Sequence, residues 1–279
     1  MPASRPSLIA KALEAGSDGV IIDLEDAVAP AEKATARDGL AASCAGELRD
    51  LSVAVSVRVN APRTPWCHLD VLACVGLGVA TVMLPKVESA ADIEFIDRLL
   101  EGAEAAAGLR EPIVVQALIE TASGVANVRE IAGAAPRLGA LVLGYADLAA
   151  SLGRTAVSPE SWHYAQDSVL VAARSAGLAA IDGPHLGVAV DDEFLASVDR
   201  AVGLGFDGKW VIHPRHVLAV QEAFKPGVDE VDKARRILAA LTESHGRGIG
   251  AATLDGAMID EAVAVWARRV LSRTHEGAA

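Results

Sequence analysis

The stretch Val20-Ile21-Ile22-Asp23-Leu24 is a short, mainly β-branched apolar run that ends in the acidic pair Glu25-Asp26. Comparable runs recur roughly every thirty residues, as in a βα repeat. They cover 53–57, 80–84, 114–119, 140–143, 179–182 and 209–213. Short apolar runs that alternate with helical stretches are typical of parallel strands joined by helices. The sequence therefore predicts a repeating βα architecture.

Helical periodicity fills the intervals between these runs. The predicted helices are 6–15, 31–42, 90–107, 124–134, 159–176, 191–204 and 214–224. A length of 279 residues suits one (β/α)8 TIM barrel, since such barrels contain about 250 residues. With 52% hydrophobic and only 4% aromatic residues, the core is expected to consist mainly of Ala, Val, Leu and Ile. The predicted fold class is α/β, a (β/α)8 TIM barrel.

The eighth strand is the weak point of this assignment. It would have to precede the helix at Pro6, where only residues 1–5 are available. We expect the first strand to be truncated. Because an open barrel exposes strand edges, either the chain begins further upstream or another segment covers the gap.

The pattern changes after residue 225. We assign 1–225 to the barrel and 226–279 to a C-terminal helical extension, with helices at 229–243 and 260–272 around a glycine-containing stretch. The extension is either a helical hairpin packed on the barrel wall or a lid that contributes to a neighbouring subunit's site, because loops near barrel mouths often close active sites.

Composition excludes several classes of function. A formal net charge of -12 disfavours a nucleic-acid or anionic membrane partner. The three cysteines, Cys44, Cys67 and Cys74, show no CxxC spacing, which argues against disulfides or a thiolate metal site. No signal peptide or apolar membrane-spanning segment is visible. We expect a cytoplasmic protein.

Charged residues at the predicted strand ends should meet, because the carboxyl ends of barrel strands form one ring. Glu120 and Asp147 follow adjacent strands, and two carboxylates completed by water and substrate oxygens are typical of Mg²⁺ sites. Each acid has a plain alternative as a solvated loop residue or helix cap. Glu25 and Asp26 would bind metal-bound waters, or else form a salt bridge with Lys33 or Arg37.

Three further groups of residues at strand ends leave alternatives open. Arg58 either binds a substrate carboxylate or enolate oxygen, or neutralises Glu25 or Asp26. Lys86 and Glu88 belong either to the site or to a structural ion pair. His185 and His213 are more typical of structural histidines than of catalytic bases.

Together these strings resemble the citrate lyase beta-subunit-like and malyl-CoA lyase family. The similarity rests on 18–28, 58–60, 83–89, 119–121, 144–148, 205–209 and 212–214, which span nearly the whole chain. The resemblance implies a (β/α)8 barrel that forms trimers or hexamers. It also implies Mg²⁺-dependent making or breaking of carbon–carbon bonds in 3-hydroxy-dicarboxyl thioesters of coenzyme A.

The resemblance also assigns roles to residues. It matches Glu120 and Asp147 to the metal ligands, Arg58 to the substrate-binding arginine, and Glu25 with Asp26 to the acidic pair around the metal waters. The tail 255–260 is similar to a motif whose last residue, here Asp260, reaches a neighbouring subunit's site as acid or base. Asp260 also precedes a helix and suits an N-cap.

The resulting hypothesis is an Mg²⁺-dependent lyase that converts citramalyl-CoA, malyl-CoA, citryl-CoA or a similar thioester into acetyl-CoA and a 2-oxo acid. Arg5, Lys11 and Lys33 would contact the CoA moiety, or else are surface charges. The rival hypotheses are an aldolase acting on free 2-oxo acids, a citrate lyase beta subunit that needs an acyl carrier, and a non-catalytic thioester-binding protein.

Overall fold

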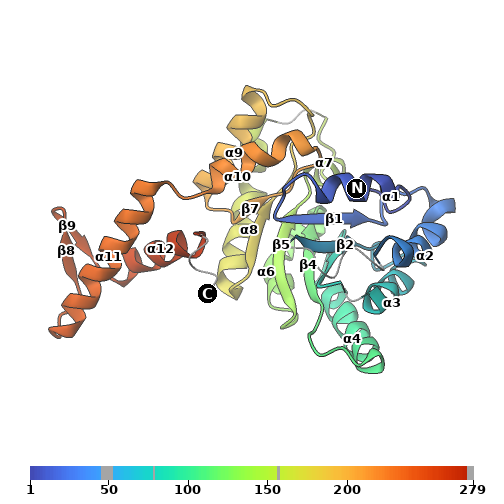
Figure 1. Ribbon diagram of the computed structural model, residues 1–279, viewed down its shortest axis with the longest axis horizontal. Helices are drawn as coiled ribbons and strands as arrows, with labels where there is room; N and C mark the ends of the chain where they lie inside the picture. Colours follow the sequence, from blue (N-terminus) through green and yellow to red (C-terminus); the bar gives the residue numbers. More distant parts are fainter. Residues whose placement is uncertain (45–52, 78, 156–157, 275–279) are drawn as a thin grey trace. The chain divides into compact units, whose positions relative to one another are not determined.

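Seven parallel strands form a single sheet in the order β1 to β7, curled into a TIM-barrel-like half-barrel (Figure 1). The computed structural model describes residues 1–44, 53–77, 79–155 and 158–274. The strands are β1 (Gly19–Asp23), β2 (Ala54–Arg58), β3 (Thr81–Leu84), β4 (Val114–Ile119), β5 (Leu138–Leu143), β6 (Ala179–Asp182) and β7 (Gly208–Lys209). All seven predicted strands are confirmed. The last is shorter than the predicted 209–213 and overlaps it at Lys209. The Trp210 N–H still donates to the Asp182 carbonyl of β6 (2.8 Å).

The register of the sheet aligns the carboxyl ends of neighbouring strands. Asp23 at the end of β1 pairs with Arg58 at the end of β2, and Leu84 at the end of β3 pairs with Ala117 in β4. Residues that follow these strands therefore emerge at one edge. This is the edge at which parallel barrels place their active sites.

Apolar side chains from several neighbouring strands form a buried cluster in the half-barrel. Met83, Leu118 and Val142 are fully buried there, and Ile21, Ile181 and Trp210 pack against them. Trp210, which follows the last strand, thus contributes to the same cluster as the first strand.

Helices alternate with the strands. Their bounds are α1 (Pro6–Leu13), α2 (Lys33–Cys44), α3 (Cys67–Leu77), α4 (Ala90–Ala107), α5 (Ala122–Ala126), α6 (Val128–Ala132), α7 (Tyr145–Ser151), α8 (His163–Ala176), α9 (Asp192–Leu204) and α10 (Val217–Phe224), with short 3-10 turns at Pro30–Glu32, Pro159–Trp162 and Pro214–His216. Two helices were not predicted from the sequence: α3, whose residues are apolar on most sides, and the short α7. The predicted helix 124–134 is interrupted at Asn127, whose side chain donates to the Glu88 carbonyl (2.8 Å).

The first three residues extend the sheet beyond β1. Pro2 forms a parallel bridge with Asp23, the Asp23 N–H donates to the Met1 carbonyl (2.8 Å), and the Ala3 N–H donates to the Asp23 carbonyl (2.8 Å). Within the described ranges this sheet has no eighth full strand, so the predicted shortfall is confirmed. Met1 to Ala3 partly cover the edge of β1 that an open barrel would expose.

The chain divides into two compact units, Met1–Val220 and Gln221–Ala279. The second unit contains α11 (Val228–Gly246), the hairpin of β8 (Ala252–Leu254) and β9 (Ala257–Ile259), and α12 (Glu261–Ser272). Both helices were predicted and the hairpin was not. The second unit has its own small core, which contains Ala234, Ile237, Ile259, Ala267 and Val270. Among the described helices of the chain, none is both long and apolar enough to span a membrane.

Candidate active site

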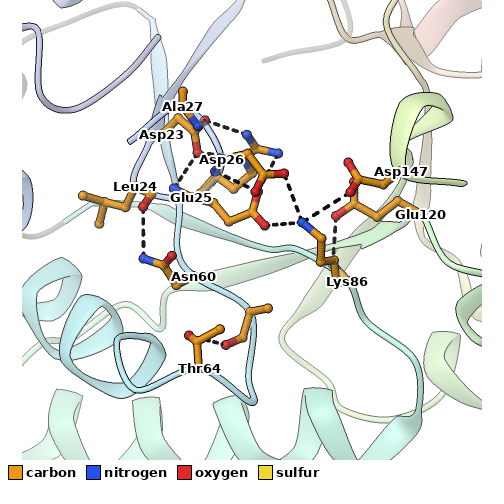
Figure 2. A network of polar contacts seen from close by, with 12 residues as sticks. Asp23, Leu24, Glu25, Asp26, Ala27, Asn60, Thr64, Lys86, Glu120 and Asp147 are labelled. Atoms are coloured by element: carbon orange, nitrogen blue, oxygen red, sulfur yellow. Dashed lines mark hydrogen bonds and ion pairs between the residues drawn. The ribbon is translucent and has the colours of Figure 1, made fainter. Parts of the chain in front are cut away.

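Charged side chains from five successive strand ends converge at the carboxyl edge of the sheet (Figure 2). Glu25 and Asp26 follow β1, Arg58 ends β2, and Glu120 follows β4. The other two members are Lys86, two residues after β3, and Asp147 in the first turn of α7. The structure thus brings together the four acids and the arginine that the sequence placed in one pocket.

Lys86 lies at the centre of this group. Its Nζ donates to Glu25 and to Asp26 Oδ2 (3.1 Å) and forms an ion pair with Asp147 Oδ1 (3.4 Å). Its backbone N–H donates to Glu120 Oε1 (3.0 Å). From the sequence, Lys86 belonged either to the site or to an ion pair with Glu88. In the structure it lies among the candidate site residues.

Glu120 is a carboxylate in an unfavourable environment. It is 2% exposed, and its carboxylate accepts a hydrogen bond from the Lys86 N–H. Burial, reinforced by the Asp147 carboxylate, raises the pKa of Glu120 to about 8. Gly144 makes room for this side chain, because a Cβ at that position would lie 2.5 Å from Glu120 Oε2.

Glu120 and Asp147 together fit a divalent cation. Figure 2 shows the two side chains next to each other, both directed towards Lys86. Within the described ranges, no group of three or more His, Cys, Asp and Glu residues is arranged as a complete metal site. A pair of carboxylates is the donor set that Mg²⁺ takes when waters and substrate oxygens complete its coordination. A cation here would also offset the cost of ionising Glu120.

Arg58 is held by a residue that sequence analysis did not assign to the site. Asp23 accepts from Arg58 Nε (2.8 Å) and Nη2 (2.6 Å), and Glu25 Oε2 lies 3.2 Å from Nη1. The Arg58 guanidinium also lies over the Trp210 ring, 5.5 Å from its centroid. The sequence did contain a signal for this role of Asp23: it is an acidic residue inside an apolar strand, and a buried carboxylate requires a partner.

Asp23 also shapes the turn that carries Glu25 and Asp26. Its carboxylate accepts from the backbone N–H groups of Glu25 (2.9 Å) and Ala27 (3.3 Å). Burial raises the pKa of Glu25, although Lys86 and Arg58 oppose the shift. Burial also disfavours ionisation of Asp26, but the contact with Lys86 outweighs it and lowers the pKa of Asp26.

The cations named as alternative partners of this acidic pair lie elsewhere. Arg37 pairs with Asp70 (3.1 Å). Lys33 is buried, and its Nζ donates to the backbone carbonyls of Leu24 (3.0 Å) and Glu25 (2.9 Å). Lys33 therefore fixes the turn after β1 through main-chain acceptors and does not pair with the carboxylates of Glu25 and Asp26.

The other two cations predicted to contact CoA, Arg5 and Lys11, are both exposed. Residues 1–3 run parallel to β1, so Arg5 follows at the same end of the sheet as Glu25. His213 caps the 3-10 turn that follows it, accepting from the Arg215 N–H (3.2 Å). His185 packs edge-on against Phe194.

A second cluster of polar side chains lies at the ends of β6 and β7. Asp182 at the end of β6 accepts from the Tyr145 hydroxyl and from Lys209 Nζ, and Lys209 also donates to the Gly183 carbonyl (2.8 Å). Gln166 donates to the Tyr145 oxygen (2.8 Å). Burial and the Asp182 carboxylate raise the pKa of Tyr145. These contacts tie β6 and β7 to the start of α7, which carries Asp147.

Asp260 is the N-cap of α12 in the second unit. Its Oδ1 accepts from the N–H groups of Ala262 (3.0 Å) and Val263 (3.3 Å). The cap predicted from sequence is therefore present. One carboxylate oxygen makes both contacts.

Comparison with known proteins places these features in a family. Residues 1–214 match the model of the HpcH/HpaI aldolase/citrate lyase family. An L-malyl-CoA/beta-methylmalyl-CoA lyase from Cereibacter sphaeroides is 37% identical over 280 residues, covering 93% of this chain and 88% of the relative. The citrate lyase subunit beta from Leuconostoc mesenteroides subsp. cremoris is 33% identical over 276 residues, covering 97% and 90%.

The fold is shared with a solved structure. CitE from Mycobacterium tuberculosis, in complex with magnesium, acetoacetate and coenzyme A, superimposes with a TM-score of 0.75. That protein is 33% identical, and the match covers 98% of this chain and 95% of the other.

Proposed function

Because this chain belongs to the HpcH/HpaI aldolase/citrate lyase family, we propose that it is an Mg²⁺-dependent lyase of 3-hydroxy-dicarboxyl-CoA thioesters. Citramalyl-CoA, malyl-CoA and citryl-CoA are the substrates to test. The proposed products are acetyl-CoA and a 2-oxo acid, and the reverse condensation uses the same groups.

The observation that carries this proposal is the convergence of Glu120, Asp147 and the Glu25–Asp26 pair around Lys86 (Figure 2). The Arg58 guanidinium lies beside Glu25 in the same group (3.2 Å). Glu120 and Asp147 would hold Mg²⁺ directly, and Glu25 with Asp26 would bind its waters. Bound there, Mg²⁺ supplies Lewis-acid polarisation of the oxygen that becomes the ketone. The solved structure of the related CitE contains magnesium, which supports a metal-dependent reaction here.

Arg58 supplies a fixed positive charge for the developing enolate. In cleavage, the substrate hydroxyl would lose its proton to water and become the ketone, and the electron pair of the carbon–carbon bond would pass to the acetyl thioester as an enolate. A preorganised cation stabilises such an enolate. Asp23 accepts from Nε and Nη2 of Arg58, and Glu25 Oε2 lies 3.2 Å from Nη1. The substrate would therefore meet the guanidinium beside Glu25, through the N–H bonds that these two acids leave. Asp23 itself is proposed as the residue that orients Arg58.

Asp260 of a neighbouring subunit is proposed as the acid that protonates the enolate carbon, or as the base in condensation. In that arrangement 226–279 acts as the arm that completes a site in a homotrimer or hexamer. The proposed CoA path runs past Arg5 and Lys11, whose exposure suits contacts with phosphates. Lys33 has its ammonium engaged inside the turn, so its proposed part is to fix the turn.

The decisive test is a panel of these CoA thioesters incubated with the protein, with and without Mg²⁺, with products identified by mass. We expect acetyl-CoA and a 2-oxo acid only when Mg²⁺ is present. Glu120→Ala and Asp147→Ala should each abolish this turnover and leave the circular dichroism spectrum unchanged. Full activity in both variants would overturn the metal assignment.

Adding free 2-oxo-acid aldols and an acyl-carrier protein to this panel separates the rival functions. Cleavage of free 2-oxo-acid aldols without CoA would indicate an aldolase, and turnover only with an acyl-carrier protein would indicate a citrate lyase beta subunit. Thioesters that bind but are not cleaved at any Mg²⁺ concentration would indicate a binding protein. Free CoA with an intact hydroxy acid would indicate hydrolysis.

A further inference from the structure

Lys86 contacts every carboxylate of the proposed metal site, and its backbone is strained to do so. Its φ is 51°, in the left-handed region that non-glycine residues seldom adopt. Among the described non-glycine residues it shares a positive φ only with Asp255. Strained backbone persists where the surroundings fix it and is concentrated at functional sites.

The strained conformation directs two donors of one residue into the same cluster. The backbone N–H reaches Glu120 Oε1 (3.0 Å), and the side chain reaches Asp26 Oδ2 (3.1 Å), Asp147 Oδ1 (3.4 Å) and Glu25. The ammonium is therefore the cation nearest to one proposed Mg²⁺ ligand and to both acids proposed to hold the metal waters.

An ammonium and a divalent ion cannot occupy the same side of a carboxylate oxygen. Mg²⁺ requires close approach to its oxygen ligands, and a second cation at that distance is strongly repelled where solvent screening is weak. The side chain of Lys86 is 31% exposed and has a flexible four-carbon stem, so it is able to move towards solvent.

We propose that Lys86 is an internal counter-cation that competes with Mg²⁺ for Asp147 and the Glu25–Asp26 pair, and so sets the metal affinity of the site. This inference deepens the proposed function and rests on its metal assignment. Before Mg²⁺ binds, the ammonium keeps the acids close together. When Mg²⁺ binds, the ammonium gives up its contact with Asp147.

The test is a titration of the purified protein with Mg²⁺ by calorimetry, at one pH and one ionic strength. We expect Lys86→Met to bind Mg²⁺ about tenfold or more tightly than wild type, because the competitor is removed. Lys86→Arg keeps the charge and should stay within about threefold of wild type. Unchanged or weaker binding by Lys86→Met would overturn the inference.

Lys86→Gly gives an independent answer if the Met variant folds poorly. Glycine favours the left-handed conformation and keeps the N–H that contacts Glu120, so this variant should fold while lacking the ammonium. It should also bind Mg²⁺ about tenfold more tightly, and its melting temperature should rise more on addition of Mg²⁺ than that of wild type. A rise equal to or smaller than in wild type counts against the inference.

Arg98→Met is the matched control. Arg98 is 73% exposed on α4 and pairs with Glu94 (2.9 Å), so its loss changes the net charge equally without touching the site. It should leave the Mg²⁺ affinity unchanged. Wild-type binding that survives Glu120→Gln would overturn the proposed function together with this inference. Binding that depends on Glu120 but not on Lys86 would overturn the inference alone.

Discussion

At the scale of the residue, the raised pKa of Glu120 leads to two predictions, one for stability and one for metal binding. Its pKa of about 8 lies above its ordinary value of 4.5, so between these values the folded protein binds more protons than the unfolded chain. Without metal, the free energy of unfolding should therefore decrease as the pH rises through this window. Urea denaturation of wild type and Glu120→Gln across the window measures the effect. The variant should show a smaller decrease.

The same proton should oppose metal binding. Below pH 8, Mg²⁺ must displace a proton from Glu120, so its affinity should rise by up to about tenfold per pH unit and level off above this pKa. Calorimetry in buffers of different ionisation enthalpy should show release of about one proton at the acidic end. An affinity that does not change with pH would mean that Glu120 is already ionised or is not a ligand.

Asp23 is the second residue with a measurable role. Asp23 is buried and neutralises Arg58, whose side chain is 11% exposed, through two contacts. Removal of one partner from a largely buried ion pair costs about 3 kcal/mol. Asp23→Asn should lower the free energy of unfolding by about this amount. By misplacing Arg58 it should also lower kcat/KM by about a hundredfold. Denaturant titration and steady-state kinetics provide the two measurements.

Glu94→Gln serves as the control for Asp23. It removes the acidic partner of an exposed ion pair on α4, and such pairs contribute at most about 1 kcal/mol. If Asp23→Asn were no more destabilising than Glu94→Gln, Arg58 would not depend on Asp23.

At the scale of the element, strands were predicted better than helices. The strands β1 to β5 are compact, mainly apolar runs with most of their residues buried, and sequence shows such runs directly. The helix α3 was missed because its residues are apolar on most sides and do not show one polar face, although Cys67 and Val71 are buried as in other helices. The β8–β9 hairpin was missed because its two strands are only three residues each.

For the site, the sequence predicted which residues come together but not how they pair. Position after a strand was enough to group Glu25, Arg58, Glu120 and Asp147, because barrel topology gathers strand ends. Which cation pairs with which acid was not predictable, since Lys86 reaches its partners through a left-handed backbone conformation. Side-chain partners depend on such local geometry, which strand pattern does not determine.

Asp260, which precedes the helix α12, has two roles that can be tested separately: the N-cap of that helix and the proposed proton transfer. Asp260 caps it through Oδ1, and Asn is as good an N-cap as Asp whereas Ala costs about 1 kcal/mol. Asp260→Asn should therefore retain stability, and Asp260→Ala should lose about this amount. Both should slow turnover by about a hundredfold or more if Asp260 transfers a proton. Thermal unfolding and kinetics on the same samples separate the roles, and normal turnover in Asp260→Asn would leave only the cap.

At the scale of the whole molecule, the question is whether one active site uses two chains. Glu120 belongs to the first unit and Asp260 to the second. If the Asp260 arm serves a neighbouring subunit, Glu120→Ala and Asp260→Asn chains should complement each other when co-expressed. In a cyclic oligomer with random mixing, about a quarter of the sites would combine an intact Glu120 with an intact Asp260.

The expected result is that co-expressed Glu120→Ala and Asp260→Asn chains regain about a quarter of wild-type kcat, although each variant alone is inactive. Co-expressed Glu120→Ala and Asp147→Ala chains are the control, because both residues lie in the first unit and no combination restores their pair. If Asp260 acts within its own chain, neither mixture regains activity. Recovery in the first mixture alone would place the acid–base residue of each site on the adjacent subunit, so turnover would require assembly.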